Sequence, residues 1–301
     1  DGRGCMGEEC CGLFRAGDIA CIIGDDTDHG SGLTQYSGLW FLVSRHFIHT
    51  AIAPPYAGLL AKTHRGTRPE FNRIDERTAS LHRSATPERP VESTATFRLR
   101  EPHYIDYHYS VVFLEEGVAR EEYVELSWCN YMNAVVDPAI YFVSDGRWVR
   151  EYSTLHGYKA MHYPTDLPRS MWERRPIEEY VKMGRPVPFH WSRSETTFDL
   201  PLYYGRVHKM VYLVMFDHYL DWRFFTSPTG GGGNVLGPGY HNPAWDWSWI
   251  ITEPKPGVRY ECNVRLVYKP YEGDQDVLEE YSKWQGHDER LLEKALSKMG
   301  R

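Results

Sequence analysis

Short runs rich in β-branched and aromatic residues follow one another from residue 18 to residue 270, with almost no helical pattern between them. Clear examples are DIACIIGD (18–25), HYIDYHYSVVFL (103–114) and KMVYLVMFD (209–217). Without intervening helices, successive strands cannot form parallel βαβ units, so they favour antiparallel sheets packed face to face. We therefore predict an all-β fold, a large antiparallel β-sandwich of the supersandwich type. Two tandem sandwiches or a jelly roll are the alternatives.

Two local signals support strand assignments. Asp145-Gly146 separates two β-rich runs, which is typical of a tight hairpin turn. Residues 258–271 alternate: apolar side chains share one face with Cys262, whereas Arg259, Glu261, Asn263 and Arg265 share the other.

Helical patterns are confined to two stretches. Pro176 begins a short candidate helix over 176–184. Residues 274–299 carry an apolar stripe at helical spacing, with Gly286 as a break. We predict a flexible N-terminal segment over 1–17, one sandwich domain over 18–272, and a helical extension over 273–301. The extension would pack outside the sheets or form a homo-oligomer contact.

Composition excludes several classes of function. The net charge is −7 without a long basic run, so nucleic acid is not an expected partner. No apolar stretch reaches the roughly 20 residues of a membrane span. We expect a cytoplasmic protein, or an exported one whose leader is absent from this chain. No nucleophile elbow, P-loop or dinucleotide fingerprint occurs. No cofactor is predicted, although 14 histidines leave a metal ion bound by histidines open.

Residues 226–249, TSPTGGGGNVLGPGYHNPAWDWSW, place a glycine run beside three tryptophans spaced two apart. In a strand, Trp245, Trp247 and Trp249 share one face, and Asp246 lies on the other. If the tryptophans face the core, Asp246 points into a cleft; if they face outward, they form a platform that stacks sugars. The glycine run would be either a lid over a ligand or a hairpin tip.

The second candidate segment enters a strand at 203–208. Arginine binds a uronate carboxylate in bidentate fashion, and tyrosine or histidine can move a proton. Tyr204, Arg206 and His208 therefore fit uronic-acid chemistry, and the alternative is a strand end with snorkelling side chains. As a hydrolase, Asp246 would need a second carboxylate, for which Asp106 and Asp217 are candidates. Asp217 could instead pair with Arg223 across a hairpin.

Several segments carry a resemblance to a known group. They are LYYGRVHKMVYLVMFD, RFFTSPTGGGG, NPAWDWSWII and VRLVYKPY, with APPYAGLLAKTHRG, RPEFNRIDERTASLHR and EPHYIDYHYS before them. Over roughly 35–270 the chain resembles an uncharacterised bacterial all-β family whose general look is similar to the galactose-mutarotase-like supersandwich of carbohydrate-active proteins. That resemblance implies a carbohydrate site on the concave face of a large sheet. Mutarotases there use a carboxylate base and a histidine acid, and many lyases use tyrosine, histidine and arginine.

Together, these patterns predict a carbohydrate-active enzyme that cleaves or rearranges an oligo- or polysaccharide, either a polysaccharide lyase or a glycoside hydrolase. The alternative is a non-catalytic carbohydrate-binding or assembly protein. The expected catalytic residues are Asp246, His241, Tyr204 and His208. The expected substrate-binding residues are Arg206, Tyr203, Tyr240, Trp245, Trp247 and Asn242. This prediction requires the 203–208 strand entry and Asp246 to meet in one hollow.

Overall fold

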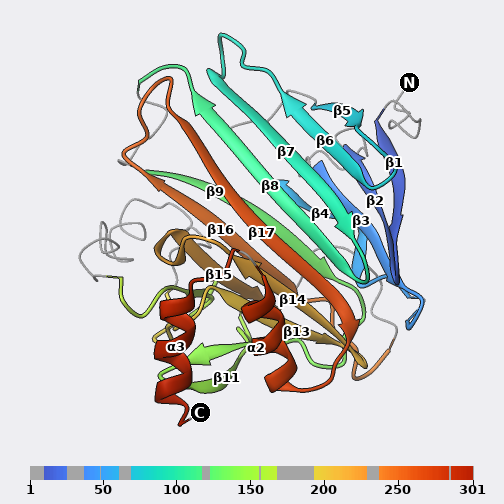
Figure 1. Cartoon of the computed structure of the whole chain (residues 1–301), viewed down its shortest axis with the longest axis vertical. Helices are drawn as coiled ribbons and strands as arrows, with labels where there is room; N and C mark the ends of the chain where they lie inside the picture. Colours follow the sequence, from blue (N-terminus) through green and yellow to red (C-terminus); the bar gives the residue numbers. More distant parts are fainter. Residues whose placement is uncertain are drawn as a thin grey trace.

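A computed structural model describes residues 10–25, 37–47, 49–60, 69–116, 123–155, 157–167, 193–228, 237–284 and 286–300. Two large antiparallel sheets pack face to face, with two short helices at the C-terminal end (Figure 1). The predicted all-β sandwich with C-terminal helices is confirmed. The candidate helix over 176–184 and the glycine run at 230–233 lie outside the described residues.

The first sheet, called sheet A here, has eight strands in the order β1-β2-β3-β4-β9-β16-β15-β12. Its strands are β1 (Cys11–Ala16), β2 (Ile19–Asp25), β3 (Ser37–Ser44), β4 (Ile52–Leu60), β9 (Tyr123–Met132), β12 (Met161–His162), β15 (Trp222–Ser227) and β16 (Ala244–Thr252). β1 lies within the residues expected to precede the sandwich, yet it pairs with β2 along its whole length.

The second sheet, sheet B, has nine strands in the order β11-β10-β13-β14-β17-β8-β7-β6-β5. Its strands are β5 (Glu70–Arg73), β6 (Thr78–Arg83), β7 (Val91–Arg100), β8 (Tyr104–Phe113), β10 (Ile140–Ser144), β11 (Arg147–Glu151), β13 (Leu202–Val207), β14 (Met210–Phe216) and β17 (Arg259–Pro270). β17 occupies the middle of the sheet, between β14 and β8.

Both local strand signals are confirmed. Ser144 pairs with Arg147, so Asp145 and Gly146 form a two-residue turn, and both have positive φ, at 47° and 68°. In β17 the polar side chains from Arg259 to Arg265 face away from the core, whereas Cys262 and its neighbours of the same parity face into it.

Aromatic rings fill the space between the sheets. Trp247 stacks on Trp128 with ring centroids 5.2 Å apart, and it also meets Phe216 of sheet B edge to face. Trp245 lies so close to β13 that a Cβ at Gly205 would stand 2.3 Å from its ring. A glycine is therefore required at this crossing, because any side chain would push the sheets apart.

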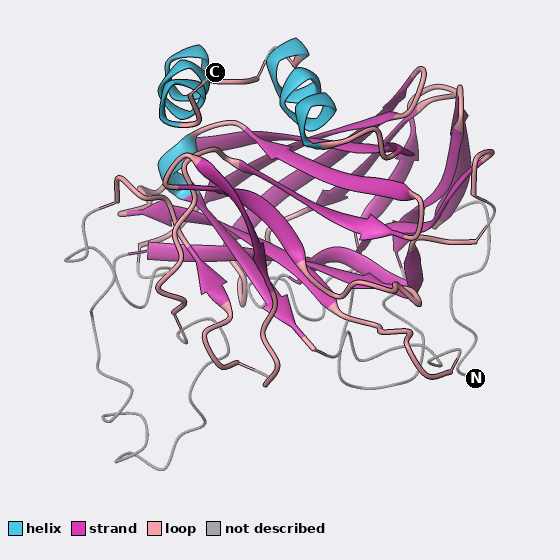
Figure 2. Cartoon of the chain, turned by 90° about the horizontal axis from the view of Figure 1, so that it is seen from below, coloured by secondary structure: helices cyan, strands magenta, loops and turns pink. Residues whose placement is uncertain are grey.

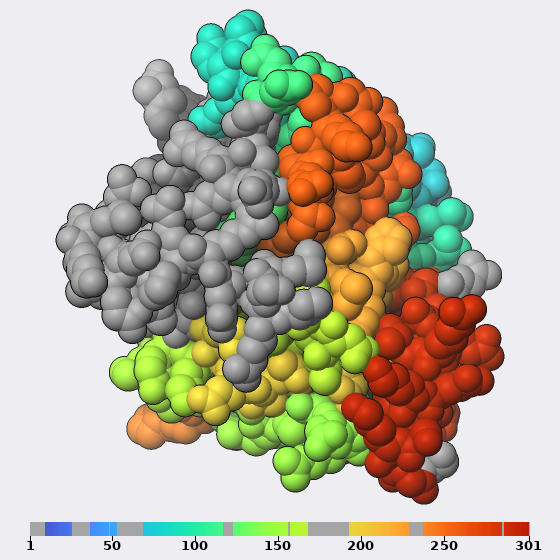
Figure 3. All heavy atoms as spheres, turned by 90° about the vertical axis from the view of Figure 1, so that its left-hand side faces the viewer, coloured from blue at the N-terminus to red at the C-terminus, as the bar shows by residue number. Residues whose placement is uncertain are grey.

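The predicted C-terminal helical stretch forms α2 (Asp274–Lys283) and α3 (Glu289–Lys298), which break on either side of Gly286. They lie over one end of the outer face of sheet B (Figure 2). Tyr281 and Leu292 pack there against Leu213 and Tyr204, in a second apolar cluster separate from the core between the sheets. In the space-filling view the helices (red) form a ridge beside residues from the middle of the chain (Figure 3). A short 3-10 helix, η4 (Tyr219–Asp221), precedes β15, and no helix among the described residues is long and apolar enough to span a bilayer.

Candidate functional site

Strand alternation divides the residues expected at the 203–208 strand entry between two faces of β13. Tyr203 is fully buried between the sheets and donates a hydrogen bond to the carbonyl of Trp245 at 2.7 Å. Tyr204 and Arg206 point the other way, toward α2. Tyr203 therefore lies in the core, and its expected contact with substrate is wrong.

Asn130 is the centre of the polar network that holds Tyr203. Its amide oxygen accepts hydrogen bonds from the Trp128 indole and the Tyr212 hydroxyl, each at 2.8 Å. Its amide nitrogen donates to Tyr203 at 3.3 Å and to the Trp245 carbonyl at 2.9 Å. Because all four hydrogen bonds of the side chain are made, a fully buried amide is tolerated in an aromatic core.

Tyr204 and Arg206 hold the C-terminal helices rather than a substrate. The Tyr204 hydroxyl donates to Asp274 at 2.6 Å, at the start of α2, and its ring stacks on Tyr141. The guanidinium of Arg206 lies 3.7 Å from the centroid of the Tyr271 ring. Burial, followed by the hydrogen bond to Asp274, raises the pKa of Tyr204 far above its ordinary value. A phenol that resists ionisation is a poor base, and the Tyr204 hydroxyl is engaged by Asp274, so the structure gives no support to the predicted proton-abstracting role.

The tryptophans of β16 face the core, which is the first of the two orientations considered from the sequence. Trp245 is 0% exposed and Trp247 is 3% exposed. Neither ring can stack on a sugar, so their expected substrate-binding role is wrong.

Asp246 lies on the opposite, outer face of β16. Its carboxylate accepts a hydrogen bond from the backbone N–H of Asn130 at 2.8 Å and is only 6% exposed. Burial raises the pKa of Asp246 to about 8, and the hydrogen bond from Asn130 only partly opposes it. At neutral pH this side chain is therefore mostly a neutral carboxylic acid that can give up a proton.

More buried polar groups lie on the same outer face. The Ser248 hydroxyl donates to Ser127 at 2.9 Å across the β16–β9 ladder, and Ser248 pairs with Arg223 on its other side. Arg223 is 6% exposed, and burial lowers its pKa to about 9. The outer face of β15, β16 and β9 thus carries the buried side chains of Asp246, Arg223, Ser127 and Ser248, and the half-buried Glu125, whose negative charge favours the charged form of Arg223. Buried groups with perturbed pKa values are typical of functional sites.

Sequence reasoning assigned Arg223 to an ion pair with Asp217, but the structure separates them. Arg223 donates to the backbone carbonyls of Leu220 and Trp222. Asp217 instead accepts two hydrogen bonds from Asn263. The signal that could have identified Arg223 is its position inside WRFFTS, where a charge in an aromatic strand requires a special environment.

The remaining site residues meet at the start of β16. His208 lies in the turn after β13 with a positive φ of 56°. Its ring bonds to the carbonyl of Ala134 at 3.0 Å and packs on the Tyr240 ring with centroids 5.8 Å apart. Asn242 accepts from the N–H of Ala134, and the His241 backbone pairs with the next residue of that segment. Ala134 also has a positive φ, of 51°. The positive φ of His208 follows from its place in the two-residue turn between β13 and β14, since Val207 pairs with Met210.

The 203–208 strand entry and Asp246 do not meet in one hollow. The end of the 203–208 segment does contact Tyr240, but Arg206 and Asp246 lie on opposite outer faces of the sandwich. The proposed carboxylate partners do not lie near Asp246 either. Asp106 binds Arg265 on the outer face of sheet B, and Asp217 bonds to the same strand. The reason is topological: β13 and β16 belong to different sheets.

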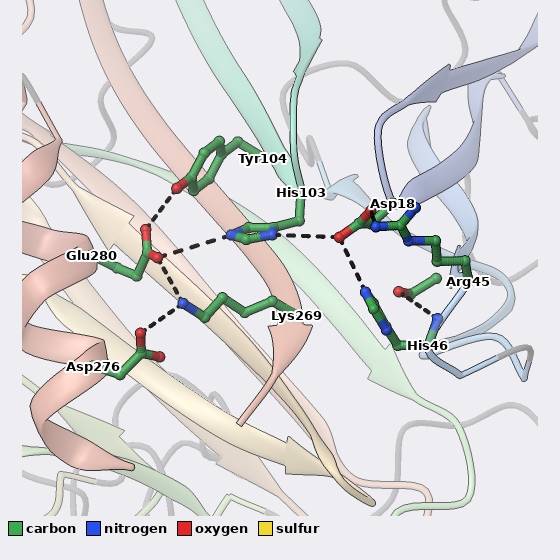
Figure 4. A network of polar contacts seen from close by, with 9 residues as sticks. Asp18, Arg45, His46, His103, Tyr104, Lys269, Asp276 and Glu280 are labelled. Carbon is green, nitrogen blue, oxygen red and sulfur yellow. Dashed lines mark hydrogen bonds and ion pairs between the residues drawn. The ribbon is translucent and has the colours of Figure 1, made fainter. Parts of the chain in front are cut away.

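A separate polar network ties α2 to both sheets (Figure 4). Glu280 of α2 accepts from Tyr104 at 3.0 Å and from Lys269 at 2.8 Å, and it lies 3.9 Å from His103. His103 in turn lies 4.0 Å from Asp18, in the turn between β1 and β2. Burial alone would raise the pKa of Glu280, but these donors outweigh it and lower the pKa to about 2. This network is structural, since it fixes the helix on the sheet.

No group of three histidine, cysteine or acidic side chains that could hold a metal ion occurs in the described part of the chain. No family model and no curated protein matches the chain. Solved structures that match include a GalM/aldose epimerase homologue from C. elegans, at 7% identity and a TM-score of 0.41, covering 87% of this chain and 100% of that one.

Two other matches are much longer proteins. Heparan sulfate lyase HepC from Pedobacter heparinus matches at 6% identity and a TM-score of 0.44, with 85% of this chain and 34% of that chain covered. The glucosidase II alpha subunit matches at 9% identity and a TM-score of 0.34, with 91% and 33% covered.

Proposed function

We propose that this protein is a carbohydrate-active enzyme, a polysaccharide lyase or glycoside hydrolase, whose reaction depends on proton transfer by Asp246. The observation that carries the proposal is the carboxyl group of Asp246, buried on an outer sheet face with its pKa raised to about 8. Cleavage of a glycosidic bond requires an acid that is still protonated near neutral pH, because the leaving oxygen must receive a proton.

Neighbouring groups on that face suit the same chemistry. Arg223, whose charge already interacts with Glu125 and Asp221, adds a cation to this face. Ser127 and Ser248 supply hydroxyls for hydrogen bonding to sugar hydroxyls. The cluster of His208, Tyr240, His241 and Asn242 lies at the start of the same strand. We propose that its polar groups bind the sugar beyond the reacting bond.

The test is an activity screen with matched variants. The protein is incubated with uronic-acid polymers and neutral glycans while absorbance near 235 nm and reducing ends are recorded. Rising absorbance identifies a lyase, and reducing ends without it identify a hydrolase. Asp246→Asn should abolish turnover of whichever substrate is cleaved.

The control is Asp217→Asn, which removes another buried carboxylate whose pKa burial also raises, on the sheet B side of the molecule. This variant should keep the wild-type rate. Equal rates in Asp246→Asn and the wild type would refute the assignment. Binding of glycans without turnover by the wild type would favour the alternative, a non-catalytic carbohydrate-binding protein.

A further inference from the structure

The outer face of sheet B that the helices leave uncovered contains a groove of about 640 Å³. Its floor is formed by β7, β8 and β17, and the end of α2 forms one wall. This volume lies within the range of pockets that bind small ligands. The groove is separate from the proposed reaction site, because Asp246 lies on the outer face of the other sheet.

Cations dominate the groove. Four positively charged side chains line it, Arg98, Arg100, Arg265 and Lys283, against the single carboxylate of Asp106. Arg265 and Arg100 both bind that carboxylate, so the positive charge in excess is carried mainly by Arg98 and Lys283. The whole chain carries a net charge of −7, so this patch is opposite in sign to the rest of the molecule. Such a patch attracts anions selectively.

A neighbouring hollow of about 600 Å³ shows that the excess of positive charge is confined to the groove. It shares Arg98 and Arg100 with the groove, but Asp75, Glu76 and Glu101 also line it. Together with Arg77, its charges cancel. The anion-binding region therefore ends where this second hollow begins.

The strand register arranges the groove into two parallel rows. Arg98 of β7 and Arg265 of β17 both lie opposite Asp106 of β8 in the strand register. These three residues form a charged row across the three strands. Thr96 and Asn263 both pair with His108, which forms a row of uncharged hydrogen-bonding groups beside it. Residues two apart on a strand are separated by roughly 7 Å, so the rows lie about one sugar ring apart.

We propose that this groove binds an acidic polysaccharide through its uronic-acid residues. Arg98 of the charged row, together with Lys283 on the wall, binds the carboxylate, because Arg265 already binds Asp106 through two hydrogen bonds. The hydroxyl, imidazole and amide groups of the other row bind ring hydroxyls. A ligand with an anion on one side of a ring and hydroxyls on the other matches both rows, whereas a simple phosphate or a run of phosphodiesters would leave the neutral row unused.

The polar network around Glu280 borders the groove on the same outer face of sheet B. Lys283 and Trp284 follow Glu280 in α2, and Tyr104, which donates to Glu280, lies under the guanidinium of Arg265 at 4.9 Å. The wall of the groove and one arginine of its charged row are thus fixed by the same contacts. A preorganised site loses less conformational entropy when a ligand binds.

The experiment measures binding by titration calorimetry in the Asp246→Asn background, so that no turnover occurs. The ligands are oligogalacturonate, a heparin oligosaccharide, a neutral maltooligosaccharide and a single-stranded DNA of matched charge. The groove variant is Arg98→Ala/Lys283→Ala, since both side chains are exposed. The control variant is Arg147→Ala/Lys255→Ala, which removes two exposed cations elsewhere.

We expect oligogalacturonate to bind more weakly as salt rises, and the groove variant to lose at least tenfold in affinity while the control changes less than twofold. Binding of the heparin oligosaccharide with the same losses would show that sulfate groups are also accepted. The proposal would be overturned if the groove variant and the control bound oligogalacturonate equally well. It would also be overturned if DNA or the neutral glycan bound most tightly, or if no ligand bound at all. The groove variant is also made without the Asp246 change, which separates the proposed groove from the proposed reaction at Asp246. This variant should still cleave a short neutral or artificial substrate, even though it binds acidic polysaccharide weakly.

Discussion

Replacing Asp246 by asparagine should make the folded protein more stable at neutral pH. The folded state raises the pKa of Asp246 from an ordinary 3.8 to about 8. The folded protein therefore holds this proton more tightly than the unfolded chain does. Its contribution to the free energy of unfolding is complete below about pH 4 and is lost as the pH rises toward 8.

The magnitude follows from the shift. Between the ordinary value of 3.8 and pH 7 lie 3.2 pH units, and each is worth 1.36 kcal/mol, so about 4 kcal/mol is lost by pH 7. Asparagine does not titrate, and its carbonyl oxygen can accept the same hydrogen bond from the N–H of Asn130. Asp246→Asn should therefore equal the wild type near pH 4 and exceed it at pH 7 by up to about 4 kcal/mol, or roughly 6 °C in the midpoint for a chain of this length.

Thermal unfolding is recorded from pH 4 to pH 8.5 by tryptophan fluorescence for the wild type, Asp246→Asn and Asp145→Asn. The last makes the same chemical change at an exposed turn and should follow the wild-type curve. Other groups also titrate over this range, but they cancel in the difference between variants. A constant difference across the pH range, or a wild type that gains stability toward pH 8 relative to Asp246→Asn, would refute the reasoning.

Three further changes test the packing and the polar networks. Glu280→Gln should cost up to about 3 kcal/mol at pH 7, because hydrogen bonds from Lys269 and Tyr104, with His103 nearby, outweigh burial and lower the pKa of Glu280 to about 2. In urea titrations the loss should disappear as the pH falls from about 4.5 toward 2. Asn130→Ala should lower the free energy of unfolding by about 3–5 kcal/mol in the same assay, because the buried indole of Trp128 and the phenol of Tyr212 lose their acceptor. A smaller loss would indicate that water replaces the amide. Gly205→Ala should lower the thermal midpoint by an amount equivalent to about 2–3 kcal/mol, since the methyl group would overlap the Trp245 ring, and an unchanged midpoint would contradict the close approach.

The sequence predicted local structure well where one residue decides the outcome. Asp145-Gly146 identifies a tight turn because few other pairs accept two positive φ values, and Gly286 identifies the helix break. The alternation in β17 indicates which face is buried. Each of these signals acts within a few residues of the chain and needs no knowledge of the partner strand.

The candidate site was harder to predict because it depends on which sheet each strand joins. The sequence shows that Tyr204 and Arg206 share a face, and that Asp246 opposes the tryptophans, but not that β13 and β16 lie in different sheets. The groove on sheet B was missed for the same reason. Arg98 and Arg265 are far apart in the chain and become neighbours only through their common pairing with Asp106.

The position of β17 determines when sheet B can be completed during synthesis of the chain. This strand joins β14 to β8, yet it ends at residue 270. During synthesis from the N-terminus, the strands of sheet B that precede it can form only two separate blocks, each with an unpaired edge. Those edges stay open to pairing with other chains until this strand leaves the ribosome. Nascent chains that stall shortly before residue 259 should therefore aggregate or recruit chaperones far more than chains released after residue 270.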